Sequence, residues 1–157
     1  MKVNKSPRHS KITGDFSEGL ILYWLSKYGF ESALLDHTGI DLISRNPHNN
    51  ELMGISVKSR SRNTGKEGQY LRISRDNFPK AENACKAFGC VPYFALVIDE
   101  GNKIYAFIIS MEHLLKIHPL TKTSCGWKMT SKWIEKYRND SNIKMFEFKY
   151  ETSSWWK

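Results

Sequence analysis

An aspartate and a lysine occur in two neighbouring apolar stretches of the sequence, where an ordinary half-buried sheet needs no charge. Asp41 lies within a run of Ile and Leu, and Lys58 ends a run of Ile and Val. Residues 46–50 between the runs are rich in Asn and contain Pro, so the two runs predict a β-hairpin. Side chains alternate along a strand, so Ser56 and Lys58 are expected to point the same way. Because an inward charge is unfavourable unless it is paired or metal-bound, we interpret Asp41 and Lys58 as functional candidates.

A second carboxylate, Glu18, lies on the first predicted helix, which we expect to run from about residue 13 to 28. Glu18 precedes Ile21, Leu22 and Leu25 by three, four and seven positions, so it lies on the apolar stripe that faces the sheet. A carboxylate in this place is explained either by function or by the preference of first helical turns for acids. Glu18 is therefore a functional candidate only in combination with the charges of the hairpin.

Two carboxylates and a lysine together are what metal-dependent cleavage of phosphodiester bonds requires. The acids hold Mg²⁺ or Mn²⁺, which polarises the phosphate and lowers the pKa of a bound water, while the lysine positions the nucleophile and offsets transition-state charge. The net charge of +8, from 24 Lys and Arg against 16 Asp and Glu, favours nucleic acid as the partner. These residues predict a metal-dependent nuclease and leave DNA and RNA open as substrates.

The motifs resemble those of the PD-(D/E)XK nuclease superfamily, the restriction-endonuclease-like fold that also includes archaeal Holliday junction resolvases. The resemblance covers about residues 14 to 73 by motif and extends to about residue 98 in the order of elements. Residues 14–18, Gly-Asp-Phe-Ser-Glu, are similar to the opening helix of the resolvases. Residues 39–41, Gly-Ile-Asp, are similar to the aspartate motif, and residues 55–58, Ile-Ser-Val-Lys, to the (D/E)-x-K strand.

This resemblance implies roles for individual residues. Asp41 would be the main metal ligand, assisted by Glu18 and by the carbonyl of Val57, and Lys58 would be the catalytic lysine. Ser56 would occupy the remaining catalytic position. The implied activity is a Mg²⁺- or Mn²⁺-dependent endonuclease that cuts double-stranded or branched DNA and leaves a 5′-phosphate.

Ser56 departs from the superfamily pattern, which has Glu or Asp at this position. A hydroxyl supplies no charge, so the affinity for a hard cation is expected to be lower. One explanation is that a downstream acid replaces the missing one, with Glu82 preferred over Glu67 and Asp76 because Glu82 follows Phe78 by one helical turn. The alternative is a catalytically inactive nuclease fold that binds DNA or a protein partner.

Basic residues that follow the hairpin are expected to contact DNA. They lie directly after the predicted catalytic strand, where each phosphate contact adds affinity through counterion release. Charge runs also occur as solvated loops with no such role. The predicted DNA-binding residues are Arg60, Arg62, Lys66 and Arg72.

The 157 residues are expected to form a single domain with an α/β fold. It would comprise a basic arm at 1–12, a core at 13–109 and a C-terminal extension at 110–157. The order αβββαβ in the core, followed by an α+β extension, predicts a mixed sheet flanked by helices. Residues 59–68 are expected to form a flexible basic loop, and residues 121–126 a second loop.

The sequence also bears on location and partners. No apolar run approaches the ~20 residues of a membrane span, and the polar N-terminus does not resemble a secretory signal, so we expect a cytoplasmic protein without a membrane partner. Trp155 and Trp156 favour a partner surface, such as that of a homodimer. Trp133 is expected to pack in the core.

Overall fold

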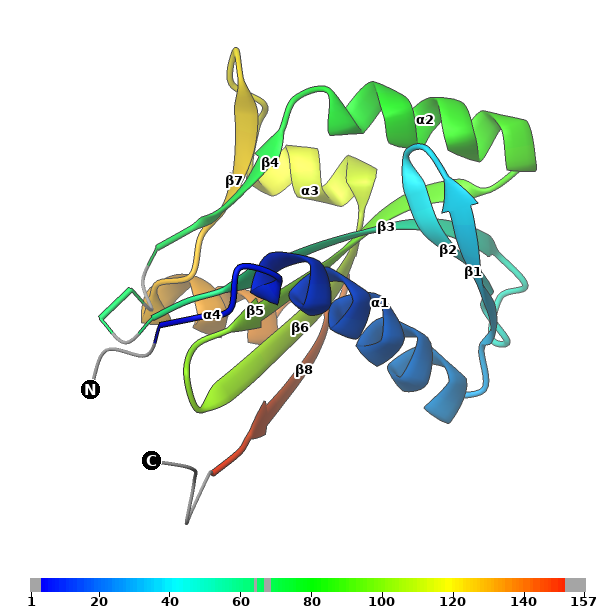
Figure 1. Cartoon of the computed structure of the whole chain (residues 1–157). Helices are drawn as coiled ribbons and strands as arrows, with labels where there is room; N and C mark the ends of the chain where they lie inside the picture. The colour runs from blue at the N-terminus through cyan, green and yellow to red at the C-terminus, as the bar shows by residue number, and fades with distance from the viewer. Residues whose placement is uncertain (1–3, 64, 67–68, 152–157) are drawn as a thin grey trace.

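A six-stranded mixed sheet forms the centre of the molecule (Figure 1). The computed structural model describes residues 4–63, 65–66 and 69–151. Neighbouring strands are antiparallel except β3 and β5, which pair in parallel. In spatial order the strands are β1 (Glu31–His37), β2 (Ile40–Arg45), β3 (Leu52–Ser61), β5 (Val91–Asp99), β6 (Lys103–Ser110) and β8 (Lys144–Lys149).

Helices cover both faces of this sheet. Helix α1 (His9–Lys27) packs on one face through Ile21, Trp24 and Leu25. The opposite face carries α2 (Asn77–Phe88), α3 (Met111–Ile117) and α4 (Ser131–Arg138), which share the larger core cluster. Helix α2 lies between β3 and β5 in the chain, as parallel neighbours require a crossover connection. The predicted α/β fold with a mixed sheet flanked by helices is confirmed.

A separate two-stranded ribbon is made by β4 (Leu71–Ser74) and β7 (Ser124–Trp127). The prediction of a loop over residues 121–126 is therefore wrong for its second half. The pairing of β7 with β4 joins segments that lie far apart in the chain, and four residues that include a glycine give no local strand signal of their own.

Two boundaries near the predicted site also differ from expectation. Helix α1 begins at His9 rather than near residue 13, so part of the predicted basic arm is helical. Strand β3 continues to Ser61, because it pairs with β5 as far as Asp99. Trp155 and Trp156, for which a partner surface was predicted, lie outside the described residues, as does Glu67.

The core on the side of α4 is a cluster of aromatic rings. Trp127 and Tyr137 stack with ring centroids 3.9 Å apart, and Trp133 packs against both Tyr137 and His118, which confirms its core placement. His118 Nε2 and the Tyr137 hydroxyl share a hydrogen bond of 2.7 Å. Burial lowers the pKa of His118 to about 4, and the charges of Lys128 and Lys136 add to this effect.

The buried His118 predicts a loss of stability on acidification. The pKa of His118 is 6.5 in the unfolded chain and about 4 in the folded protein. The unfolded chain therefore takes up a proton first as the pH falls. The contribution of His118 to the free energy of unfolding is constant well above pH 6.5. It should fall by about 3 kcal/mol in total as the pH is lowered from there to 4. Urea unfolding at a series of pH values measures it. His118→Gln should lack this component, and an identical pH dependence in the variant would contradict the assignment.

No helix in the described part of the chain is long and apolar enough to cross a membrane.

Candidate active site

Asp41 stands at the start of β2, directly against β3. Its Oδ2 accepts a hydrogen bond from the backbone N–H of Val57 at 2.7 Å. Leu42 pairs with Ile55 across the two strands, and both side chains belong to the core under α1. Because side chains alternate, Ser56 points to the other face of β3, where its neighbour in β5, Phe94, belongs to the core beneath α2. The predicted hairpin therefore brings Asp41 beside the Ile-Ser-Val-Lys strand.

The turn before Asp41 is held by a close approach of α2. Gly39 has a φ of 105°, in the region that favours glycine. A Cβ at this position would overlap the backbone carbonyl of Lys80 in α2. The glycine thus allows the first half of α2 to pack on the turn that carries Asp41, which places the charges of that helix end near the same face.

Lys58 lies near the middle of β3, on the face that it shares with Ser56. Its neighbour in β5 is Leu96, which belongs to the core beneath α2. Burial lowers the pKa of Lys58, while the negative charges of Asp41, Asp76 and Glu18 act in the opposite direction. The lysine is therefore partly desolvated, and three carboxylates and the ammonium of Lys80 act on it electrostatically, which makes it a candidate functional group.

Glu18 of α1 interacts electrostatically with these groups. Its pKa is raised, first by burial and then by the nearby charge of Asp41. The charges of Asp41 and Lys58 both act on Glu18, and that of Glu18 acts on Lys58. Three charged groups from α1, β2 and β3 thus interact electrostatically, and their joint role in a site stays a prediction.

Ser56 is buried, with 2% of its surface exposed. It supplies no carboxylate at this position, so a third acid in the site would have to come from elsewhere. Asp76 precedes α2 and is the second charge, after Asp41, that favours the protonated form of Lys58. Glu82 is exposed further along α2, and its charge is not among those that act most strongly on Lys58. Asp76 is exposed as well, so replacement of the missing acid by either residue stays a prediction.

Within the described ranges, no three His, Cys, Asp or Glu side chains gather into a ready metal-binding group. The residues present still fit a divalent cation. The negative charge of Asp41 contributes to the raised pKa of Glu18, and a bound cation would relieve this repulsion. Mg²⁺ commonly binds through one or two carboxylates and keeps several waters. Asp41, Glu18 and the carbonyl of Val57 therefore remain the predicted ligands.

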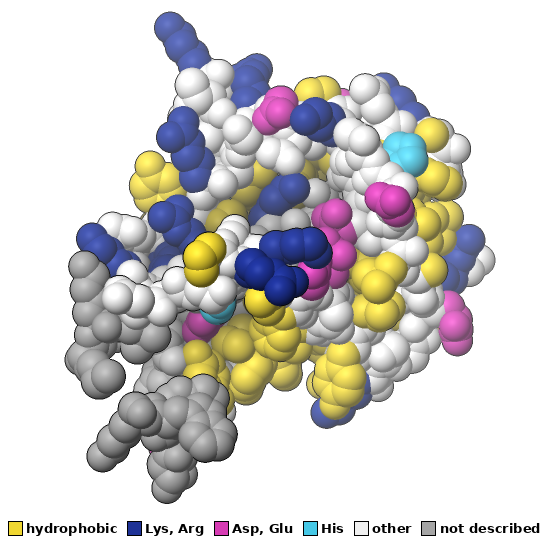
Figure 2. All heavy atoms as spheres, in the orientation of Figure 1, with side chains coloured by type: hydrophobic (Ala, Val, Ile, Leu, Met, Phe, Trp, Pro, Cys, Tyr) yellow, Lys and Arg dark blue, Asp and Glu magenta, His cyan; other side chains and the backbone are white. Residues whose placement is uncertain are grey.

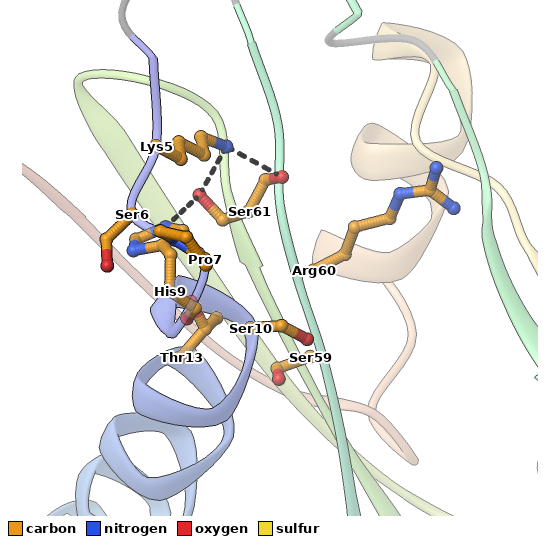
Figure 3. A pocket seen from close by; sticks show the side chains of 9 residues that line it. All are labelled: Lys5, Ser6, Pro7, His9, Ser10, Thr13, Ser59, Arg60 and Ser61. Carbon is orange, nitrogen blue, oxygen red and sulfur yellow. Dashed lines mark hydrogen bonds between the residues drawn. The ribbon is translucent and has the colours of Figure 1, made fainter.

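The end of β3 presents different residues to its two sides (Figure 3). Ser61 points toward the N-terminal end of α1, and Lys5 donates hydrogen bonds to its Oγ at 2.9 Å and to its carbonyl at 3.0 Å. These residues line an open pocket of about 380 Å³. Arg60 points away from α1, to the side of β3 that also carries Lys58. Its placement suits the predicted contact with DNA near the site.

Arg62 is enclosed by protein. Its side chain is 1% exposed, and Nη1 lies 3.5 Å from Oε1 of Glu100. A guanidinium in this position does not reach a backbone phosphate, so the prediction that Arg62 contacts DNA does not fit the structure. The sequence showed only a basic run; the backbone N–H of Arg62 instead continues the pairing with β5 by donating to Asp99. Lys66 and Arg72 are exposed, and their contact with DNA stays a prediction.

The charges are unevenly distributed over the face that carries the site (Figure 2). Acidic side chains form a small patch in the middle of this view, with basic side chains beside it. Further Lys and Arg side chains gather at the upper left, over the ribbon of β4 and β7 seen in Figure 1. A concentration of positive charge of this kind raises the local concentration of polyanions.

Comparison with known proteins identifies the architecture. One similar solved structure is the 1.6 Å structure of Hjc from Archaeoglobus fulgidus, a Holliday junction resolvase from an archaeal hyperthermophile. The TM-score is 0.56 at 18% sequence identity, and the match covers 78% of this chain and 88% of that one. The chain has the restriction-endonuclease-like fold. No family profile and no curated protein sequence matches it.

Within the restriction-endonuclease-like fold of this chain, Lys80 is a site neighbour that the sequence did not single out. It forms an ion pair of 3.0 Å with Asp76 and acts electrostatically on Lys58. The spacing of Asp76 and Lys80, four positions apart at the start of a helix, was the available signal. It indicates a surface ion pair in any helix, so only the fold reveals its closeness to Lys58.

Proposed function

We propose that this chain is a divalent-metal-dependent endonuclease that hydrolyses phosphodiester bonds of DNA and leaves a 5′-phosphate. The observation that carries the proposal is the electrostatic interaction of Glu18, Asp41 and Lys58 from three elements, with Asp41 hydrogen-bonded to the backbone of Val57. The restriction-endonuclease-like fold supports it, as does the net charge of +8.

Asp41, Glu18 and the carbonyl of Val57 are the residues that would hold Mg²⁺ or Mn²⁺. When bound, the cation would polarise the scissile phosphate and lower the pKa of a coordinated water. The chain prepares this site by fixing Asp41: Oδ2 is engaged by the Val57 N–H, which leaves the second oxygen for a cation. The raised pKa of Glu18 means that its ligand form is lost at a higher pH than for an ordinary glutamate.

Lys58 acts on the substrate side of the site. Burial lowers the pKa of its ammonium, so the group gives up a proton more readily than an exposed lysine. It can hold the attacking water by a hydrogen bond and offset the negative charge that develops on the phosphate. The negative charges of Asp41, Asp76 and Glu18 act against the effect of burial and favour the charged form of Lys58.

The substrate is proposed to be double-stranded or branched DNA. Four-way junctions belong among the substrates tested, because the similar Hjc is a Holliday junction resolvase. The test is incubation of the purified chain with Mg²⁺ or Mn²⁺ and with plasmid, linear duplex or four-way-junction DNA, followed by analysis of the new ends. Cleavage that needs the cation, stops with EDTA and leaves 5′-phosphates is expected. DNA binding without any cleavage would favour an inactive nuclease fold instead.

Asp76 is proposed to supply the acid that Ser56 lacks. Asp76→Asn should weaken the binding of Mn²⁺ and slow cleavage by about tenfold, the lower range for groups that support a metal site. Glu82→Gln is the matched control, because it removes an exposed carboxylate of the same helix. Calorimetric titration with Mn²⁺ and single-turnover cleavage measure both variants. A larger effect for Glu82 than for Asp76 would contradict this assignment.

A further inference from the structure

The ribbon of β4 and β7 has one buried face and one exposed face. Strand β4 pairs with β7 from Leu71 opposite Trp127 to Ser74 opposite Ser124. The buried side chains fasten the ribbon to the core beneath α2 and α4; they are Leu71, Ile73, Cys125 and Trp127. On the exposed face, Arg72 lies opposite Gly126. The ribbon is a separate two-stranded sheet and not part of the six-stranded one.

The ribbon carries positive charge without any negative charge of its own. Residues 69–75 and 119–128 contain Arg72, Arg75, Lys122 and Lys128 and no Asp or Glu. All four basic side chains are exposed. Over the whole chain, by contrast, 16 acidic residues accompany 24 basic ones. The ribbon is thus a local concentration of the positive charge, which suits a polyanion.

The two arginines are held in place and keep donors to spare. Arg72 Nη2 donates to Thr123 Oγ1 at 2.8 Å, and Arg75 Nη1 donates to the Thr121 carbonyl at 2.6 Å. A guanidinium carries more N–H donors than such single bonds use. Held in this way, each group loses little side-chain freedom when it binds a phosphate.

Tyr70 adds a flat aromatic surface at the start of the ribbon. Its ring is 53% exposed and lies over Gly126, where a Cβ would stand 3.1 Å from Cδ2 of the ring. An exposed ring next to arginines is a surface on which the sugars or bases of nucleic acid can pack. The glycine on the opposite strand makes room for the ring in this position.

The ribbon is adjacent in the chain to a residue that acts on the candidate site. Arg75 is followed by Asp76, whose charge acts on Lys58. Four residues of antiparallel strand extend over about 13 Å, which corresponds to roughly four base pairs of duplex DNA. A duplex with its scissile phosphate at Lys58 would therefore have the ribbon beside its backbone on one side of the cut.

We infer that the ribbon of β4 and β7 is a second DNA-contacting element, which binds backbone phosphates of the duplex that flanks the scissile bond. Arg72 and Arg75 make these contacts, and Tyr70 packs against the same strand. The inference rests on the proposed function for the location of the cut. A two-stranded ribbon also has the width that the major groove admits, so the exposed face can follow the backbone at the groove edge.

The test is the salt dependence of DNA binding, measured by fluorescence anisotropy with Ca²⁺ in place of Mg²⁺ on duplexes of increasing length. Arg72→Ala combined with Arg75→Ala should reduce the slope of log Kd against log salt by about 2, one unit for each lost phosphate contact. The gain in affinity on lengthening the duplex on one side should also disappear. Lys27→Ala combined with Lys86→Ala, which removes two exposed lysines from the ends of α1 and α2, should leave both quantities unchanged.

Thr123→Ala separates contact with DNA from a purely structural role. It removes the hydrogen-bond partner of Arg72 but keeps the charge, so the salt slope should be retained. An unchanged slope in the double arginine variant, or an equal loss in Thr123→Ala, would overturn the inference. If the double arginine variant has the reduced slope but the wild-type chain does not cleave DNA in Mg²⁺, the ribbon is a DNA contact and the proposed hydrolysis is wrong. If the wild-type chain cleaves DNA but the double arginine variant keeps its slope, the hydrolysis stands and the inference about the ribbon is wrong. The absence of DNA binding in the wild-type chain would overturn both.

Discussion

Asp41→Asn is expected to lower the single-turnover rate of DNA cleavage about a thousandfold, because the loss of a charged metal ligand removes several kcal/mol of transition-state stabilisation. Asparagine still offers a side-chain oxygen to the N–H of Val57, so the hydrogen bond that fixes this residue is retained. The fold should be unaffected, and affinity for Mn²⁺ should fall with the rate. Rapid-quench cleavage assays and calorimetric titration of Mn²⁺ measure the two effects.

Asp36→Asn is the matched control for this variant. Asp36 is an exposed acid on β1, outside the group of charges that act on Lys58. Its replacement should leave the rate of cleavage and the affinity for Mn²⁺ unchanged. Equal rates in Asp41→Asn and the wild-type chain would show that the cleavage, if present, occurs at a different site.

Gly39→Ala is expected to lower the free energy of unfolding by about 3 kcal/mol, which is large for the addition of one methyl group. Two causes combine. The backbone of Gly39 has a φ of 105°, which an alanine adopts only with strain. The new Cβ would also overlap the carbonyl of Lys80, so α2 would have to move away from the turn before Asp41. Urea unfolding followed by circular dichroism measures the change.

Gly14→Ala provides the control of opposite sign. Gly14 lies within α1, and no atom stands within 4 Å of a Cβ at that position. Alanine is favoured over glycine inside helices, so this variant should be more stable by about 0.5 to 1 kcal/mol. If Gly39→Ala were as stable as the wild-type chain, the close packing of α2 on the Asp41 turn would not exist in solution.

The hairpin of Asp41 and Lys58 could be predicted because its signals are local. The Asn- and Pro-containing turn and the alternation along each strand are read within twenty residues, and they fix the face of Ser56 and Lys58. The helical spacing of Glu18 from its apolar neighbours is local as well. These signals were sufficient for the mixed sheet flanked by helices, and they single out the three charges of the candidate site.

The features that escaped prediction depend on contacts between distant segments. Strand β7 forms only because it pairs with β4, and Arg62 is buried only because β3 and its continuation pair with β5 up to Asp99. The closeness of Lys80 to the turn before Asp41 depends on how α2 packs against Gly39. A sequence pattern gives the composition of such segments but not the partner that each one meets.

The most direct test of the central claim is the anomalous diffraction of Mn²⁺ in crystals of the protein grown with the cation and duplex DNA. A peak is expected beside the carboxylates of Asp41 and Glu18 and the carbonyl of Val57, with a DNA phosphate and Lys58 next to it. Asp41→Asn crystals grown in the same way should lack the peak. A wild-type crystal with bound DNA and no Mn²⁺ at Asp41, or with the cation held by other residues, would contradict the proposed active site.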